Sequence, residues 1–476
     1  MTRLAASKTV LVVADDLEST HNVAALRIKD AAVRGKARVV VMSPLWNELN
    51  DFAEVWVRPA PGGQAAAAAA LAAAVEQAKG LAVGEKPSVP QALIEPMAKA
   101  VEILASGAAP ASVVYALPHF GAEAVGAVTT ALANIAIAVA GAEAPQALFI
   151  LPQEANVAGM RDVGAAAGLL PGHRIADDSG RTEMQRIWGA QLPSVAGLTF
   201  EEMSANGKVK ALVILEDNPV MLAPNSPRVR KWLESLEFLA VIDSLPTDTA
   251  ALAHAVLPNV SPWAREGTTT SADRRVLRLN PGPAPQGEAR QGWRILTELG
   301  ARLAQRFQPG EIRIHYQSAA EIMEEIAQVV PLYQKATYRE MDAGAQQYIY
   351  AIGPKKWERV PIPAVAVPSG GAGFTLTTGR GLYTSYEGAA IHDPDADPLH
   401  REDGVRIHPD DAAALGVADG DSVTLSNPRG RLTVRATLTE AVQPRSLHLP
   451  LYFDAGAVAA LFDAGSPITT VEITPA

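Results

Sequence analysis

The sequence predicts an α/β protein that ends in a small β-barrel, and three observations support this prediction. Apolar strand-like runs alternate with helical segments from residue 9 to about residue 350, which is the pattern of a parallel sheet covered on both faces. Residues 352–373 then lose any helical period and become rich in Pro, Gly and Val, as interdomain linkers do. Beyond them, short strands separated by Asp-Gly and Pro-Arg-Gly turns indicate a small barrel.

The first region, residues 1–148, is expected to form one α/β domain. We predict strands at residues 9–14, 37–42 and 112–117, and helices at residues 22–34, 64–77, 91–105 and 122–140. Ligands of open parallel sheets lie beyond the carboxyl ends of the strands. A cofactor of this domain would therefore lie at the loops of residues 15–21 and 43–49.

Composition limits the classes of function. The chain has 476 residues, 48% of them hydrophobic and 19% charged, which suits two to four folded domains rather than a disordered chain. Its net charge of -10 and its lack of Lys/Arg runs argue against nucleic acid as a partner. The absence of Cys excludes disulfides, thiolate nucleophiles and Cys-ligated zinc or iron-sulfur clusters on this chain.

Membrane and targeting signals are weak in the sequence. The apolar stretch of residues 9–14 is short and is followed at once by two Asp residues, so it is better interpreted as a first buried strand than as a signal sequence. The longest uncharged run, residues 124–142, is Ala-rich and contains Thr129, Thr130 and Asn134. This composition favours a buried globular helix over a membrane span. Any membrane attachment is therefore expected through a partner.

A second α/β region is predicted for residues 149–351. It contains expected strands at residues 211–215 and 238–242, then a turn at 243–246 and a helix that starts at 247–250. Its glycines Gly159, Gly164 and Gly168 do not have the spacing of a dinucleotide-binding fingerprint. We interpret them as turn residues with positive φ rather than as a phosphate cradle.

The last region comprises the linker, residues 352–373, and the barrel, residues 374–476. Strands are predicted at residues 374–380, 405–409, 420–425 and 429–434, with a short helix that ends near residues 414–417.

An ordered series of short motifs resembles the molybdopterin oxidoreductase superfamily. It includes Ala255-Val256-Leu257-Pro258, Arg265-Glu266-Gly267-Thr268, Asp273-Arg274-Arg275-Val276 and Gly287-Glu288-Ala289-Arg290, together with Asn156-Val157-Ala158-Gly159-Met160-Arg161-Asp162-Val163-Gly164 and Leu169-Leu170-Pro171-Gly172 upstream. The resemblance implies two interleaved α/β domains of molybdopterin-oxidoreductase type and a C-terminal double-psi-like barrel of the molybdopterin dinucleotide-binding kind.

The positions that would hold the cofactor depart from the superfamily pattern. In active members, the segment after the first strand has a pattern similar to Ser-Asn-x-x-Glu-x-His-Pro. This chain has Asp15 and Asp16 in that segment. Active members carry Asp-Pro-Arg after the next strand, where Leu45 and Trp46 stand here. Carboxylates repel phosphate and the Arg clamp is lost, so we expect a degenerate pocket, lined by Asp15, Asp16, Trp46 and the pair Gly379 and Arg380.

One branch of the superfamily combines these departures: the large peripheral-arm chains, called G-type, of NADH-quinone oxidoreductase, respiratory complex I. The segments that resemble it are residues 379–383, 447–453, 456–458 and 470–473. This resemblance implies a structural subunit with no catalytic, cofactor-binding or metal-binding residue and no cofactor of its own. Its partners would be other peripheral-arm chains that carry iron-sulfur clusters and FMN, on the cytoplasmic side of the inner (plasma) membrane.

Two alternatives and one question of gene structure accompany this expectation. The chain could be the cofactor-binding part of an active, formate dehydrogenase-like molybdopterin oxidoreductase whose iron-sulfur domain is another chain. It could also be an unrelated nucleotide-binding α/β protein, if the ordered motifs arose by chance. Because the Cys-bearing parts of the G-type chains are missing, we expect either a split gene product or a C-terminal piece.

Residues 392–408 hold the remaining candidate chemistry. Asp393, Asp395 and Asp397 start like a calcium loop, but Pro398 and Gly404 stand where Gly and Glu are required. The spacing of His392, His400 and His408 matches no compact metal-ligand motif, so we expect solvated loop histidines.

Overall fold

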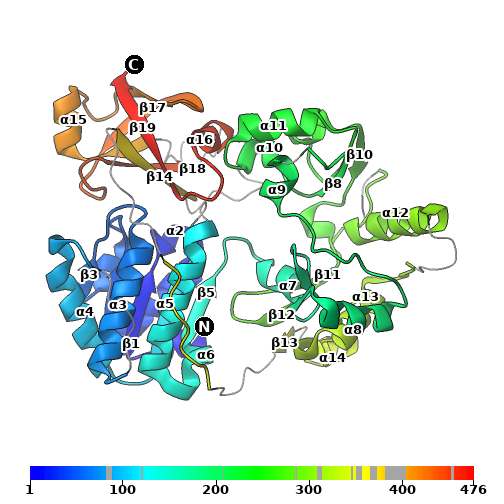
Figure 1. Cartoon of the computed structure of the whole chain (residues 1–476), viewed down its shortest axis with the longest axis horizontal. Coiled ribbons are helices and arrows are strands. Elements are labelled where there is room, and N and C mark those ends of the chain that lie inside the picture. Colours follow the sequence, from blue (N-terminus) through cyan, green and yellow to red (C-terminus); the bar gives the residue numbers. More distant parts are fainter. Residues whose placement is uncertain are drawn as a thin grey trace. The chain divides into compact units, whose positions relative to one another are not determined.

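The computed structural model of the chain contains two compact units, which are described separately below (Figure 1). The described residues are 1–81, 88–118, 122–205, 207–283, 285, 287–307, 314–344, 347–349, 356–364, 373–380, 404–451 and 455–476. The first unit joins residues 1–153 with residues 222–226 and 352–476, and the second contains residues 154–221 and 227–351. The first α/β region and the barrel therefore belong to one unit although about 200 residues separate them.

The first unit is built on a five-stranded parallel sheet in the order β3-β2-β1-β4-β5. Its strands are β1 (Thr9–Val13), β2 (Arg38–Met42), β3 (Val55–Val57), β4 (Ala111–Ala116) and β5 (Leu148–Leu151). The predicted strands correspond to β1, β2 and β4. The short edge strands β3 and β5 were not predicted, and β5 begins at the boundary that we placed between the first two regions.

The helices around this sheet are α1 (Thr2–Ala6), α2 (Leu17–Val33), α3 (Gln64–Ala78), α4 (Ile94–Ser106), α5 (Ala122–Ala140) and α6 (Ala144–Ala147). The four predicted helices correspond to α2, α3, α4 and α5; the short helices α1 and α6 were not predicted, and α4 begins at Ile94 after a 3-10 turn at Gln91–Leu93. Helix α2 begins at Leu17 rather than at Asn22, because Asp16 caps it by accepting the Ser19 amide. A break with φ -139° and ψ 55° at His21 divides the helix where the sequence pattern starts.

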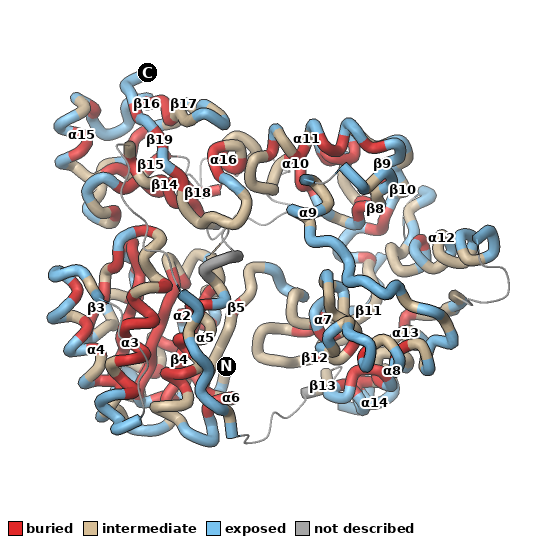
Figure 2. The backbone as a smooth tube through the Cα atoms, viewed as in Figure 1, coloured by how far each residue is buried: buried red, intermediate tan, exposed pale blue. Residues whose placement is uncertain are grey.

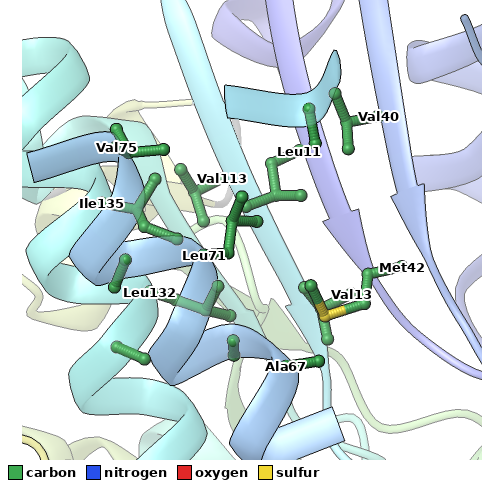
Figure 3. Packing of buried hydrophobic residues seen from close by; sticks show 14 of the residues in the cluster. Leu11, Val13, Val40, Met42, Ala67, Leu71, Val75, Val113, Leu132 and Ile135 are labelled. Carbon is green, nitrogen blue, oxygen red and sulfur yellow. The ribbon is translucent and has the colours of Figure 1, made fainter. Parts of the chain in front are cut away.

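The core of this unit lies between the sheet and the Ala-rich helices. Leu71 and Val75 of α3 pack with Leu132 and Ile135 of α5 over Leu11 and its strand neighbours (Figure 3). Alanine side chains let α3 and α5 approach closely, and α3 is buried almost along its whole length (Figure 2). Helix α5 is long and apolar enough to cross a membrane. One face of α5, with Ala131, Leu132 and Ile135, packs in this core.

The C-terminal region forms a closed six-stranded barrel in the order β14-β18-β15-β17-β16-β19. The strands are β14 (Phe374–Arg380), β15 (Gly404–Ile407), β16 (Ser422–Asn427), β17 (Gly430–Leu438), β18 (Ser446–Leu451) and β19 (Ile468–Pro475), with helices α15 (Pro409–Leu415) and α16 (Ala455–Leu461). Leu376, Val405 and Leu425 are fully buried in its interior. The predicted barrel is confirmed, including its Pro-Arg-Gly hairpin between β16 and β17.

The second unit holds a parallel sheet, an antiparallel sheet and several helices. Its parallel sheet has the order β10-β9-β8, and its antiparallel sheet the order β11-β12-β13. The elements are α7 (Val157–Asp162), β6 (Leu169–Leu170), β7 (Arg174–Ile175), α8 (Asp178–Trp188), α9 (Phe200–Ala205), β8 (Ala211–Leu215), α10 (Pro219–Leu222), α11 (Ser226–Glu234), β9 (Phe238–Asp243), β10 (Ala255–Pro258), β11 (Gly267–Thr270), β12 (Arg275–Leu279), α12 (Gly292–Phe307), α13 (Ala319–Val329), α14 (Tyr338–Ala343) and β13 (Gln347–Ile349).

Two sequence predictions about the second unit need correction. The helix predicted to start at residues 247–250 is only a short 3-10 turn, Ala250–Leu252, because the chain enters β10 three residues later. Gly164 and Gly168 have positive φ, as predicted. Gly159 instead lies inside α7, where a Cβ would collide with the Asn156 side chain.

Candidate functional site

The candidate site is the carboxyl edge of the first sheet, where β1 and β2 end. Asp15 and Asp16 follow β1 directly. The Asp15 carboxylate accepts a 3.0 Å hydrogen bond from the Gln64 amide at the start of α3. Burial raises the pKa of Asp15 to about 6; the Gln64 hydrogen bond lowers it, and the Asp16 carboxylate adds a smaller rise. A partly buried carboxyl group therefore lies directly after the carboxyl end of β1.

Asp16 caps the N-terminus of α2. One carboxylate oxygen accepts the Ser19 amide at 3.1 Å and the other accepts the Ser19 hydroxyl at 2.6 Å. This cap uses an N–H group that a helix N-terminus would otherwise offer to an anion. On the neighbouring strand β4, burial raises the pKa of Tyr115, and the Asp15 carboxylate adds a smaller rise. The edge therefore favours protonated or neutral groups.

Side-chain hydrogen bonds hold the loop after β2 in place. Asn47 donates to the Asp15 carbonyl at 3.0 Å, and the Trp56 indole donates to the Ser43 carbonyl at 3.0 Å. Leu45 is buried, with 2% of its surface exposed, whereas Trp46 is 40% exposed. Neither side chain can supply the bidentate cation that the Asp-Pro-Arg pattern would place here.

Arg58 is a basic side chain at this edge, but it binds protein carbonyls. Its Nη2 donates to the carbonyls of Glu440 and Ala441, both at 3.0 Å, and its guanidinium lies 4.5 Å from the Trp56 ring centroid. Gln443 donates to the carbonyls of Pro44 and Pro59 at 3.2 and 2.8 Å. The barrel loop of residues 440–443 thus packs directly on the edge of the sheet. Burial lowers the pKa of Arg58.

Among the described residues of this edge, the charged and capping groups do not have the arrangement that binds a phosphate. Phosphate recognition needs accessible N–H groups at a helix N-terminus or an Arg or Lys directed at the anion. Here Asp16 accepts a first-turn amide of α2, Asp15 adds a carboxyl group, and Arg58 is directed at backbone carbonyls. Whether a cofactor binds in this family position stays a prediction that the metal analysis described below tests.

The structure brings together some of the residues expected to line the degenerate pocket. Asp15, Asp16 and Trp46 share the edge of the sheet, and the Trp46 amide donates to the Ala441 carbonyl at 2.9 Å. Gly379 lies on β14, where a Cβ atom would lie 3.6 Å from the His448 ring. The side chain of Arg380 and residues 392–400 lie outside the described residues.

The expectation for His408 is corrected. This residue caps α15, and its side chain is only 17% exposed rather than solvated. Within the described ranges, no group of three or more His, Asp or Glu side chains is arranged to hold a metal.

Sequence reasoning missed a polar cluster around the buried carboxylate of Asp162 in the second unit. The carboxylate of Asp162 contacts His173 Nε2 at 2.5 Å and Arg274 Nη1 at 3.4 Å, and it accepts a 2.8 Å bond from the Tyr333 hydroxyl. His173 and Arg274 both have positive φ, at 60° and 66°. Asp162, Gly172 and Arg274 belong to motifs of the superfamily pattern, but no local spacing linked Asp162 to Tyr333, 171 positions away.

Comparison with known protein families identifies the class of protein. Residues 1–302 match the family model of molybdopterin oxidoreductase, and residues 374–474 match the molydopterin dinucleotide binding domain. The chain belongs to the molybdopterin oxidoreductase family. The resemblance inferred from the motifs is thereby confirmed.

Individual relatives are subunits of oxidoreductases. The chain is 32% identical to NADPH-Fe(3+) oxidoreductase subunit alpha of Geobacter sulfurreducens, over 97% of this chain and 56% of that protein. It is 26% identical to the second G-type subunit of NADH-quinone oxidoreductase of Rhizobium meliloti, over 98% and 54%. It is 32% identical to F420-dependent formate dehydrogenase subunit alpha of Methanocaldococcus jannaschii, over 63% and 47%. The chain thus spans about half the length of the curated relatives it matches.

A solved structure supports the fold. Acetylene hydratase from Pelobacter acetylenicus matches with a TM-score of 0.65 over 99% of this chain and 78% of that chain, at 16% identity. At this identity the likeness concerns the fold alone.

Proposed function

We propose that this chain is a non-catalytic structural subunit of the peripheral arm of an NADH-quinone oxidoreductase of the complex I type. In this proposal the chain is a molybdopterin-oxidoreductase body without a pterin. Iron-sulfur clusters and FMN are carried by partner chains, and membrane attachment on the cytoplasmic side occurs only through them. The supporting observation is the carboxyl edge of the first sheet, where Asp15 and Asp16 place two carboxyl groups and Arg58 binds the barrel loop.

The relatives also favour a second candidate function. The identities of 32% to an NADPH-Fe(3+) oxidoreductase subunit and to a formate dehydrogenase subunit exceed the 26% to the G-type chain of NADH-quinone oxidoreductase. The chain would then be the pterin-binding half of an active oxidoreductase with its iron-sulfur domain elsewhere. This function requires molybdenum or a related metal in the assembled protein.

Metal analysis of the natural complex separates the two candidates. A tagged chain is purified with its partners, and iron, flavin and molybdenum are measured per chain. The structural-subunit proposal expects iron and FMN in the complex, no molybdenum, and a colourless, metal-free isolated chain. About one molybdenum per chain, a single-site occupancy, would overturn this proposal in favour of the second candidate. Recovery of the chain only as a free monomer in native gels of membranes would also contradict it.

Substitutions at the degenerate pocket provide a kinetic test. Asp16→Asn keeps a competent helix cap, and Arg380→Ala removes a cation from the predicted pocket. Both variants are expected to leave NADH-quinone turnover per assembled complex nearly unchanged, because electrons move between clusters on other polypeptides. A loss of about a hundredfold in a fully assembled complex, equivalent to roughly 2.7 kcal/mol of barrier, would show that the pocket takes part in the reaction.

A further inference from the structure

Helix α2 is apolar on two opposite faces. Ala24, Ala25 and Ile28 are buried against the unit. On the other side, Val23, Leu26 and Val33 are exposed by 60%, 52% and 54% of their surface. Single exposed apolar residues are ordinary, but three aligned on one helix face indicate an interaction surface.

The exposed residues have the spacing of a helix-pairing seam. Positions 23, 26, 30 and 33 are separated alternately by three and four residues, as the a and d positions of a heptad are. Asp30 is the single polar residue among them. The seam residues line a shallow groove of about 520 Å³ with Arg27, Lys29 and Arg34, so the whole groove lies along α2. A second helix is the element that such a seam accommodates.

Charge along the seam restricts the occupant. Arg27 and Arg34 flank it at equivalent heptad positions, with 49% and 83% of their side chains exposed. Both guanidinium groups lie near the same carboxylate, that of Asp30, at 3.5 and 3.6 Å. Ion pairs this long and exposed contribute little. One flank of the seam is therefore cationic, although the chain as a whole has a net charge of -10.

We propose that α2 is a docking helix for an acidic amphipathic helix of a partner oxidoreductase subunit. Apolar side chains of the partner pack between Val23, Leu26 and Val33, and its carboxylates pair with Arg27 and Arg34. The inference rests on the proposed function in that the partner is another subunit of the same complex.

A second copy of this chain fits the seam less well than an acidic helix. Parallel pairing of two α2 helices would set Asp30 against Asp30 inside the seam. Antiparallel pairing would bring the Arg27 and Arg34 flanks of the two copies together. Both arrangements place like charges in contact, which is unfavourable.

The test uses the assembled complex with a tag on this chain. Leu26→Glu introduces a charge into the seam, and Leu81→Glu is the matched control, since Leu81 is 44% exposed in the same unit. Leu26→Glu is expected to lower the retention of partner subunits about tenfold or more, and Leu81→Glu to leave it unchanged. Arg27→Glu combined with Arg34→Glu should also lower retention, most clearly at low salt. Both Leu variants should keep the wild-type Tm of the isolated chain; Leu26→Ser replaces Leu26→Glu if that variant is misfolded.

A photo-crosslinking amino acid at position 26 identifies the occupant. We expect a crosslink to a partner peptide with heptad-spaced apolar residues and flanking Asp or Glu. Normal retention of partners by Leu26→Glu, or a crosslink to a second copy or to the same chain, would overturn the proposal. The proposed function is tested separately by the molybdenum content of the complex. A molybdenum-free complex without docking on α2 would overturn only the docking proposal. A molybdenum-containing complex with docking on α2 would overturn only the proposed function.

Discussion

Arg359 donates from its Nε to the buried Oε1 of Glu76 over 2.5 Å, although the two residues are 283 positions apart. Beside this pair, the Asn134 side chain both donates to the Val360 carbonyl at 2.9 Å and accepts the Val360 amide at 3.3 Å. Residues 356–364 were predicted as part of a linker. In the structure they are an irregular segment fastened to α3 and α5.

The Glu76–Arg359 pair is expected to stabilise the first unit. Glu76 has 1% of its side chain exposed and Arg359 has 34%. Arg359→Ala would leave the carboxylate buried without its cation, at a cost of about 1–3 kcal/mol after allowance for solvent around Arg359. Urea denaturation measures this cost. Arg339→Ala is the control, because Arg339 is 92% exposed in its pair with Glu340; equal effects of the two substitutions would contradict the prediction.

Asp15 is expected to make stability depend on pH. The pKa of Asp15 in the folded state is raised from 3.8 to about 6. The favourable contribution of the protonated Asp15 to the free energy of unfolding is therefore fully present below pH 3.8 and is lost as the pH rises through 6. Asp15→Asn keeps an acceptor for Gln64 and removes the charge. We expect this variant to exceed wild type by about 1–2 kcal/mol near pH 8 and to equal it near pH 4. A difference that does not change with pH would disprove this explanation.

His448 should act on stability in the acid range. It lies on β18 beside Thr377, with Nδ1 3.0 Å from the Thr377 hydroxyl oxygen. Burial, with a further contribution from Arg406, lowers the pKa of His448 from 6.5 to about 3. The contribution of neutral His448 to the free energy of unfolding is therefore fully present above pH 6.5 and is lost as the pH falls toward 3. His448→Gln should flatten this loss in acid titrations followed by circular dichroism, and an unchanged acid slope in this variant would contradict the prediction.

Tyr333 is expected to hold the polar cluster of the second unit together. Its buried hydroxyl lies 2.8 Å from the Asp162 carboxylate and 2.7 Å from the Thr270 hydroxyl. Tyr333→Phe removes both bonds where water has little access, which should cost about 1–3 kcal/mol in thermal or urea unfolding. Tyr316→Phe also removes a bond to a carboxylate, that of Glu325, but in a more exposed place. The prediction fails if the Tyr316 variant is destabilised as much as the Tyr333 variant.

The sequence alone determined the elements whose patterns are local. The bounds of helix Ala122–Ala140 and strand Ala211–Leu215 agree with the prediction to the residue, because hydrophobic periodicity is set by neighbouring side chains. The family resemblance and the unfavourable charge of Asp15 and Asp16 also came from short, ordered stretches.

Only the tertiary structure decided which distant residues meet. It placed β5 in the first sheet, directed Arg58 at the carbonyls of residues 440 and 441, and gathered His173, Arg274 and Tyr333 around Asp162. Each of these contacts depends on how the chain closes over tens to hundreds of residues, and the free energy of that closure comes from packing that no local spacing encodes. The exposed seam of α2 has the same origin, since periodicity predicted a helix but only the fold showed which of its two apolar faces is left uncovered.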